Sequence, residues 1–234
     1  MITEGSFAVL VNSQCLPTAV GSIDGGRRVL SGPGLLFVLS GPSGAGKDTL
    51  INELLPRQER LIKCVSATTR PARAGEVEGT DYFFLDRGEF TRRAAANGFL
   101  ESREYNGNFY GTPRAFIEEQ LRHGYDVIAK PEVNGAIAIK KHFEDAVLIF
   151  TVPDRFSRLA SRLAARRTET NEEIALRLEI AHEELQAVRS FDYLVINEEQ
   201  RPEDAVDDLA AIVRAERYRI HRYSDSTIRT LEQT

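Results

Sequence analysis

Short apolar runs recur along the chain, and each is bounded by glycines or polar residues. They occupy 35–39, 126–129, 146–152 and 193–196, and they predict strands that are buried on both faces. Amphipathic stretches with helical spacing lie around and between them, at 49–55, 113–123, 135–142, 155–165, 172–188 and 202–218. Strands that alternate with helices at these spacings indicate an α/β fold, in which helices flank a parallel sheet.

Two parts of the chain depart from this alternation of strands and helices. The segment 64–110 is rich in Thr, Arg, Gly and aromatic residues, with short strand-like pieces such as 82–85, and it predicts an inserted, mostly β flap over about 64–112. Residues 1–33 carry one apolar stretch, at 7–11, followed by Pro17 and several glycines. We interpret 1–33 as an extension of unknown role, 34–220 as the organised domain and 221–234 as a tail.

Composition narrows the class of protein. Lys and Arg number 30 against 35 Asp and Glu, which gives a formal charge of −5 and argues against a nucleic-acid partner. Cys15 and Cys64 lie far apart, with no CxxC and no neighbouring His pair for zinc. No apolar run approaches the roughly 20 residues that span a bilayer, and 1–5 lack the basic flank of a signal peptide. We therefore expect a cytoplasmic protein with no membrane partner.

A glycine-rich turn follows the first predicted strand and opens the next predicted helix. Its sequence from Gly41 to Lys47 has the spacing G-x-x-x-x-G-K, which is typical of a loop that surrounds phosphates with backbone N–H groups. The positive end of the helix and the Lys47 ammonium add favourable charge. The turn predicts ATP binding by Gly41, Ser43, Gly44, Ala45, Gly46, Lys47, Asp48 and Thr49.

Asp48 occupies the position where a Ser or Thr usually meets Mg²⁺ in such turns. A carboxylate is also a hard oxygen ligand, so Asp48 and the Thr49 hydroxyl are candidate Mg²⁺ ligands. Its negative charge would oppose ATP unless Mg²⁺ offsets it. The alternative is that Asp48 only caps the first helical turn and touches no metal.

A second candidate anion site follows at 66–82. Arg70 and Arg73 lie three residues apart, with Ser66 before them and Tyr82 after them. Guanidinium groups bind phosphate oxygens in pairs, and hydroxyls complete the shell. The stretch resembles the guanylate kinase signature S-x-T-T-R-x-x-R-x-G-E-x-x-G-x-x-Y, and the resemblance continues through 99–101 and 107–112. It covers about residues 35 to 218, and it identifies the chain as similar to the P-loop nucleoside monophosphate kinases.

That resemblance implies a site for GMP and a reaction in which ATP phosphorylates GMP to GDP by direct in-line transfer. It places Ser66, Arg70, Arg73, Glu76, Tyr82 and Tyr110 around GMP, and Glu101, Thr112 and Glu132 at the guanine. A carboxylate suits guanine because it accepts from both N1–H and N2–H₂. The segment 155–178 resembles the family's helical lid, with Arg166 and Arg177 matching the arginines that reach the phosphates. Lys47, Arg70, Arg166 and Arg177 are then the candidate catalytic residues, with Mg²⁺.

Departures from the family keep alternatives open. The lid lacks both usual glycines at 162–167, and Lys130 replaces the first carboxylate of the segment 130–135. Lys130 either supplies positive charge, signals altered Mg²⁺ handling, or turns out of the site. A kinase of the same fold that acts on ribose 1,5-bisphosphate is one alternative. A catalytically weak guanylate-kinase-like domain that binds phosphopeptides is another. We expect a monomer or a weak homodimer.

Overall fold

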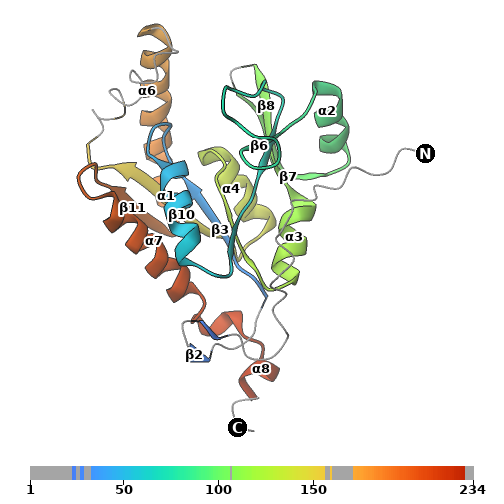
Figure 1. Ribbon diagram of the computed structural model, residues 1–234, viewed down its shortest axis with the longest axis vertical. Helices are drawn as coiled ribbons and strands as arrows, with labels where there is room; N and C mark the ends of the chain where they lie inside the picture. Colours follow the sequence, from blue (N-terminus) through green and yellow to red (C-terminus); the bar gives the residue numbers. More distant parts are fainter. Residues whose placement is uncertain are drawn as a thin grey trace. The chain divides into compact units, whose positions relative to one another are not determined.

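The computed structural model describes residues 23–24, 27–28, 33–105, 107–155, 159 and 171–229 (Figure 1). The strands are β1 (Ile23–Asp24), β2 (Arg27–Arg28), β3 (Leu36–Ser40), β4 (Leu61–Lys63), β5 (Ser66–Thr68), β6 (Tyr82–Phe84), β7 (Phe99–Tyr105), β8 (Asn108–Pro113), β9 (Asp126–Ala129), β10 (Val147–Pro153) and β11 (Tyr193–Asn197). The α-helices are α1 (Lys47–Leu54), α2 (Arg87–Ala95), α3 (Arg114–Arg122), α4 (Val133–His142), α6 (Asn171–Gln186), α7 (Pro202–Glu216) and α8 (Asp225–Arg229). The 3-10 helices are η1 (Leu55–Arg57), η2 (Ala187–Ser190) and η3 (Ile220–Arg222).

The larger sheet is parallel and has five strands in the order β11-β10-β3-β9-β4. All five residues of β3 are buried, as are all four of β9. An apolar run without alternation is expected where helices cover both faces of a parallel sheet. The predicted α/β fold is therefore confirmed, and β9 has the predicted bounds. The three-residue strand β4 was not predicted.

The described chain divides into two compact units. One contains the described residues of 1–35, 59–127 and 214–234, and the other contains 36–58 and the described residues of 128–213. The predicted phosphate-binding turn lies in the second unit. The predicted flap, with its separate four-stranded sheet, lies in the first.

In the second unit, helices pack on the strands through buried aliphatic residues. α4 packs on β3 and β10, and its Ile139 is fully buried. α1 and α7 run side by side (Figure 1), and Arg57 at the end of η1 pairs with Asp207 of α7 at 2.7 Å. Buried side chains of α1 and α7, including Leu50, Ile51 and Leu209, complete this core.

In the first unit, the flap folds as a mixed sheet in the order β6-β5-β8-β7. β5 runs parallel to β6 and antiparallel to β8. One face is apolar: Phe90 of α2 stacks on Phe99 and Phe109, with ring centroids 4.5 Å and 5.5 Å apart. The helix α2 was not predicted. It begins after Asp86, whose side chain accepts a hydrogen bond from the Glu89 amide at 2.8 Å, a usual N-cap contact.

The same unit contains a buried ion pair at the first residue of β9. The Asp126 carboxylate is 3% exposed and accepts hydrogen bonds from the Leu35 amide at 2.9 Å and from Arg217 Nε at 2.8 Å. Burial raises the pKa of Asp126, and the charge of Arg217 opposes this rise. The pair ties residues from three distant parts of the sequence together.

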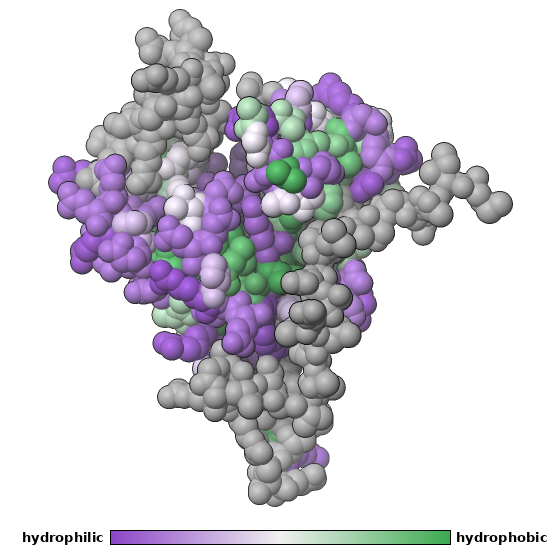
Figure 2. Space-filling view, in the orientation of Figure 1, coloured by the Kyte–Doolittle hydropathy of each residue, from purple (hydrophilic) through white to green (hydrophobic). Residues whose placement is uncertain are grey.

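Several predictions fall outside the described residues. These are most of the extension 1–33, the end of the tail, the predicted helix 155–165 except residues 155 and 159, and most of the lid 155–178. Among the residues that the structure does describe, no helix is long and apolar enough to cross a membrane. The face shown in Figure 2 is mostly hydrophilic over the described residues, with hydrophobic side chains in smaller groups.

Candidate functional site

The glycine-rich turn connects β3 to α1 in the second unit. Gly41 has φ +139°, and a Cβ at this position would lie 2.1 Å from the Thr151 carbonyl oxygen of β10. A side chain therefore cannot be accommodated without moving β10 away from β3. This close approach explains why the chain needs glycine at the first position of the turn.

The turn ends where α1 begins. Gly46 precedes the helix with φ 91°, in the left-handed region, and the Leu50 amide donates to the Gly46 carbonyl at 3.0 Å. The amides of the first helical turn have no acceptor within the helix, so they are suited to bind an anion. Lys47 Nζ donates to the carbonyls of Gly41 at 2.6 Å and Pro42 at 3.0 Å. The ammonium thus lies against the start of the turn.

Asn197, which was not predicted as a site residue, holds the middle of this turn. Its buried Nδ2 donates to the Ala45 carbonyl at 2.8 Å. Asn197 is the last residue of β11. A polar residue directly after the apolar run 193–196 was the available signal, because carboxyl ends of parallel strands carry binding residues.

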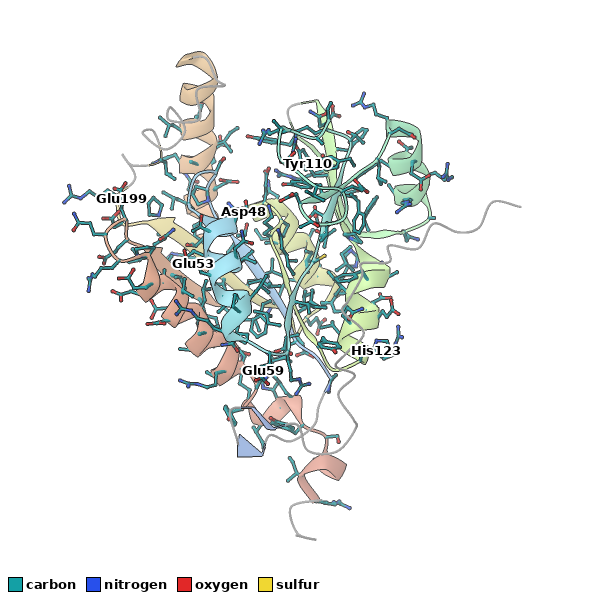
Figure 3. All side chains as sticks on the ribbon, viewed as in Figure 1. Asp48, Glu53, Glu59, Tyr110, His123 and Glu199 are labelled. Atoms are coloured by element: carbon teal, nitrogen blue, oxygen red, sulfur yellow. The ribbon has the colours of Figure 1, made fainter. Side chains whose placement is uncertain are left out.

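Asp48 and Thr49 are exposed on the first turn of α1, where Figure 3 labels Asp48. Asp48 Oδ1 forms an ion pair with Lys130 Nζ at 2.7 Å. Lys130 therefore does not turn away from this region, and the two residues that depart from the family pattern meet each other. Glu132 lies in the same unit, at the N-cap position of α4.

A polar face covers the four-stranded sheet of the first unit. Cross-strand partners share a face of a sheet, and the register pairs Ser66 with Tyr82, Thr68 with Tyr110, and Arg103 with Tyr110. In a regular strand, residues two apart point to the same face. A register shift between Phe99 and Ser102 interrupts this alternation, so Phe99 lies on the apolar face whereas Glu101 lies on the polar face. We call this the acceptor face; it carries Ser66, Tyr82, Glu101, Arg103, Tyr105, Tyr110 and Thr112.

Arg70 lies on the loop after β5, which is anchored to β8. The Thr68 hydroxyl donates to the Phe109 carbonyl at 3.0 Å and accepts from the Arg70 amide at 3.1 Å. The Arg70 guanidinium lies 5.3 Å from the centre of the Tyr82 ring. These contacts fix where the guanidinium can point.

Glu76 binds Arg70 through both carboxylate oxygens, with Nη1–Oε2 and Nη2–Oε1 distances of 2.9 and 2.8 Å. The Arg70 and Glu76 side chains are only 12% and 19% exposed. The hydrogen bond with Glu76 raises the pKa of Arg70, to which Tyr110 also contributes, and the same bond lowers the pKa of Glu76. The arginine is thus held charged and oriented, as a phosphate ligand must be.

Glu101 lies on β7, and its Oε1 accepts a hydrogen bond from the Thr112 hydroxyl at 2.7 Å. Burial raises the pKa of Glu101, against the effects of the Thr112 hydrogen bond and the Arg103 charge. A carboxylate held in this way has a second oxygen for other donors. Arg103, which lies over the Tyr105 ring at 5.6 Å, was not identified from the sequence; its place two residues after Glu101 on an alternating strand was the signal.

The structure brings together most of the predicted acceptor residues of the first unit. Ser66, Tyr82, Glu101, Tyr110 and Thr112 lie on the acceptor face, and Arg70 and Glu76 lie in the loop beside Tyr82. Arg73 contributes its amide to Glu76 at 2.7 Å, while its side chain is exposed. Arg166 lies outside the described residues, as does the side chain of Arg177, although α6 includes its backbone. Glu132 belongs to the other unit.

Comparisons with known proteins agree on one family. The family model described as guanylate kinase matches residues 34–216. A guanylate kinase from Thermotoga maritima is 42% identical over 82% of this chain and 92% of that protein, and one from Thermus thermophilus is 45% identical over 82% and 86%. The crystal structure of guanylate kinase from Anaplasma phagocytophilum superposes with a TM-score of 0.70 at 32% identity and covers 86% of this chain and 96% of that one.

Proposed function

The chain belongs to the guanylate kinase family and is an ATP:GMP phosphotransferase, and we propose that the two groups of residues described above divide the reaction between them. The glycine-rich turn of the second unit binds ATP, and the acceptor face of the first unit binds GMP. The observation that carries this assignment is the acceptor face with the loop beside it: Thr112 holds the partly buried Glu101 carboxylate on that face, and the oriented Arg70 guanidinium lies over the Tyr82 ring.

The acceptor face would recognise the two ends of GMP separately. Arg70, Tyr82 and Tyr110 bind the phosphate through charged and hydroxyl donors, with Arg73 and Ser66 at its edge. Glu101 accepts the N–H groups of guanine, while Thr112 holds the carboxylate in place. Adenine lacks this pair of donors and would leave the partly buried carboxylate with only the Thr112 hydroxyl as a donor, so the site should discriminate against it through hydrogen bonding.

On the donor side, the amides of 44–49 and the Lys47 ammonium would hold the β- and γ-phosphates. Asp48 and Thr49 fit a magnesium site as a partial shell, since both present hard oxygens on the first turn of α1. Among the described residues no cluster of three His, Cys, Asp or Glu side chains could hold a metal, so phosphate oxygens and water would supply the remaining ligands. Bound Mg²⁺ would offset negative charge on the triphosphate.

The transfer step needs positioning and charge rather than a protein nucleophile. The GMP phosphate oxygen attacks the γ-phosphorus of ATP, the bond from that phosphorus to the bridging oxygen of ADP breaks, and GDP and ADP result. Lys47 and Arg70 stabilise negative charge on the transferred group. From the family resemblance, we propose that Arg166 and Arg177 of the segment 155–178 contribute further positive charge.

The function is tested by comparing acceptors. GMP, AMP and ribose 1,5-bisphosphate are each supplied with ATP and Mg²⁺, and ADP release and the phosphorylated product are measured. We expect efficient GDP formation and a strong preference for GMP over the other two. A preference for ribose 1,5-bisphosphate would indicate a kinase of the same fold that acts on this acceptor instead of GMP. Binding of GMP with no transfer to any acceptor would indicate a binding domain.

A further inference from the structure

Two residues of opposite charge, Asp48 and Lys130, meet at the phosphate-binding turn although 82 positions separate them. Their side chains form an ion pair of 2.7 Å, with Asp48 63% exposed and Lys130 only 11% exposed. Asp48 is the second residue of α1 and directly follows Lys47. Lys130 directly follows β9. The pair therefore links the first turn of α1 to the segment that follows β9.

The backbone around Lys130 is fixed next to the turn. Ser40, the last residue of β3, donates its hydroxyl to the Pro131 carbonyl at 2.9 Å, and both residues are buried. Gly41 follows Ser40 and begins the turn. Because the segment after β9 is attached one residue before the turn, Lys130 is anchored beside it rather than reaching it from a mobile loop. An almost buried ammonium that is already anchored loses little side-chain entropy when it pairs.

The charge of Asp48 is unfavourable for the ligand of this turn. The amides of α1 and the Lys47 ammonium attract a polyanion, whereas a carboxylate on the adjacent residue repels it. Lys130 brings the net charge of the pair to zero. Without Lys130, the mostly exposed Asp48 carboxylate would act on the triphosphate uncompensated.

We propose that Lys130 is a positioning residue of the donor site: it neutralises Asp48 and holds its carboxylate, and the turn can then accept a triphosphate. The proposal rests on the assignment of 41–49 to ATP. It predicts that replacing Lys130 weakens the binding of a triphosphate only while residue 48 carries a negative charge. This dependence separates it from a general structural role of Lys130.

The test is the affinity of a non-hydrolysable ATP analogue, measured by calorimetry in buffer with EDTA, so that any role of Asp48 as a metal ligand drops out. Lys130→Met should weaken binding about tenfold or more, the effect of one uncompensated charge near a polyanion. Adding Asp48→Asn to that variant should return the affinity to within about threefold of the wild type. Asp48→Asn alone should bind the analogue at least as tightly as the wild type.

Lys140→Met is the matched control, because Lys140 of α4 pairs with Asp192 at 3.2 Å in the same unit and should leave analogue binding unchanged. GMP titrations check that each variant keeps its fold. The proposal is overturned if Lys130→Met binds the analogue like the wild type, if the double variant stays as weak as Lys130→Met, or if Asp48→Asn alone binds more weakly. Wild-type GDP formation is measured in parallel; its absence would refute the proposed function, whereas its presence with unchanged affinities would refute only the role of Lys130.

Discussion

Replacement of Arg70 by alanine tests the acceptor face most sharply. The guanidinium uses two donors at 2.9 and 2.8 Å to bind Glu76, and it is held over the Tyr82 ring. A hydrogen bond to a charged partner contributes about 1.5–3 kcal/mol. Two such bonds to the GMP phosphate, reduced because Glu76 shares the guanidinium, should together contribute about 3 kcal/mol to the transition state. We therefore expect kcat/KM for GMP to fall about 100-fold.

Part of that loss should come from Glu76, because its carboxylate would remain beside the phosphate without its main partner. Replacing Glu76 by glutamine in the Arg70→Ala background should recover about tenfold of the lost kcat/KM. Initial rates of ADP release at saturating ATP, with GMP varied, measure both variants. Arg87→Ala is the control, since Arg87 also lies over an aromatic ring, Phe109 at 4.7 Å, but is 61% exposed and pairs with Glu104. An Arg70→Ala enzyme with the kcat/KM of the Arg87→Ala control would show that Arg70 does not bind the phosphate.

Three further changes probe other parts of the structure. Glu101→Gln should reduce the GMP-to-AMP ratio of kcat/KM, because an amide accepts only one guanine donor well; an unchanged ratio would place the base contact elsewhere. Since burial raises the pKa of Glu101, its charged form destabilises the fold at neutral pH, so Glu101→Gln should raise Tm there. This advantage should shrink as pH falls through the pKa of Glu101, which lies above the range of an ordinary glutamate. Wild-type GMP affinity should decline over the same pH interval. A Tm difference between variant and wild type that is the same at neutral pH and below this interval would contradict the expectation. Arg217→Met leaves the buried Asp126 carboxylate without its charged partner and should lower the free energy of unfolding, measured in urea, by about 3–5 kcal/mol. A decrease of less than about 1 kcal/mol, the value of an exposed pair, would show that the pair does not stabilise the fold in this way. Gly41→Ala should abolish binding of the ATP analogue while GMP still binds, because a Cβ would lie 2.1 Å from the Thr151 carbonyl; normal analogue binding would show that β10 can move.

The sequence predicted those parts of the fold that periodicity and turn chemistry determine locally. The run 126–129 became β9 without change, and 193–196 became β11 with one residue added. The glycine spacing predicted a tight turn between β3 and α1, since a loop that closely approaches a neighbouring strand requires glycine. The helix α2 was missed because it has only nine residues and a single buried anchor, Phe90, too few for a clear helical pattern.

In the candidate site, too, the features that depend on local patterns were predictable and the contacts between distant segments were not. Resemblance named the acceptor residues, and strand alternation then explains why Glu101, Tyr110 and Thr112 share a face. No local pattern pairs Asp48 with Lys130 or Asn197 with Ala45, because each contact joins distant segments through the order of strands in the parallel sheet. Considered alone, Asp48 and Lys130 are two separate departures from the family pattern. Together they form one neutral pair.

The central claim is that this chain moves the γ-phosphoryl group of ATP directly onto GMP, using Lys47 on one side and Arg70 on the other. A single-turnover experiment with ATP labelled in the γ-phosphate, GMP and excess enzyme tests it most directly. We expect the label to pass to the β-phosphate of GDP with none on the protein, and Lys47→Ala and Arg70→Ala each to slow this step. Label that accumulates on the protein, or GDP that forms at the wild-type rate in both variants, would contradict it.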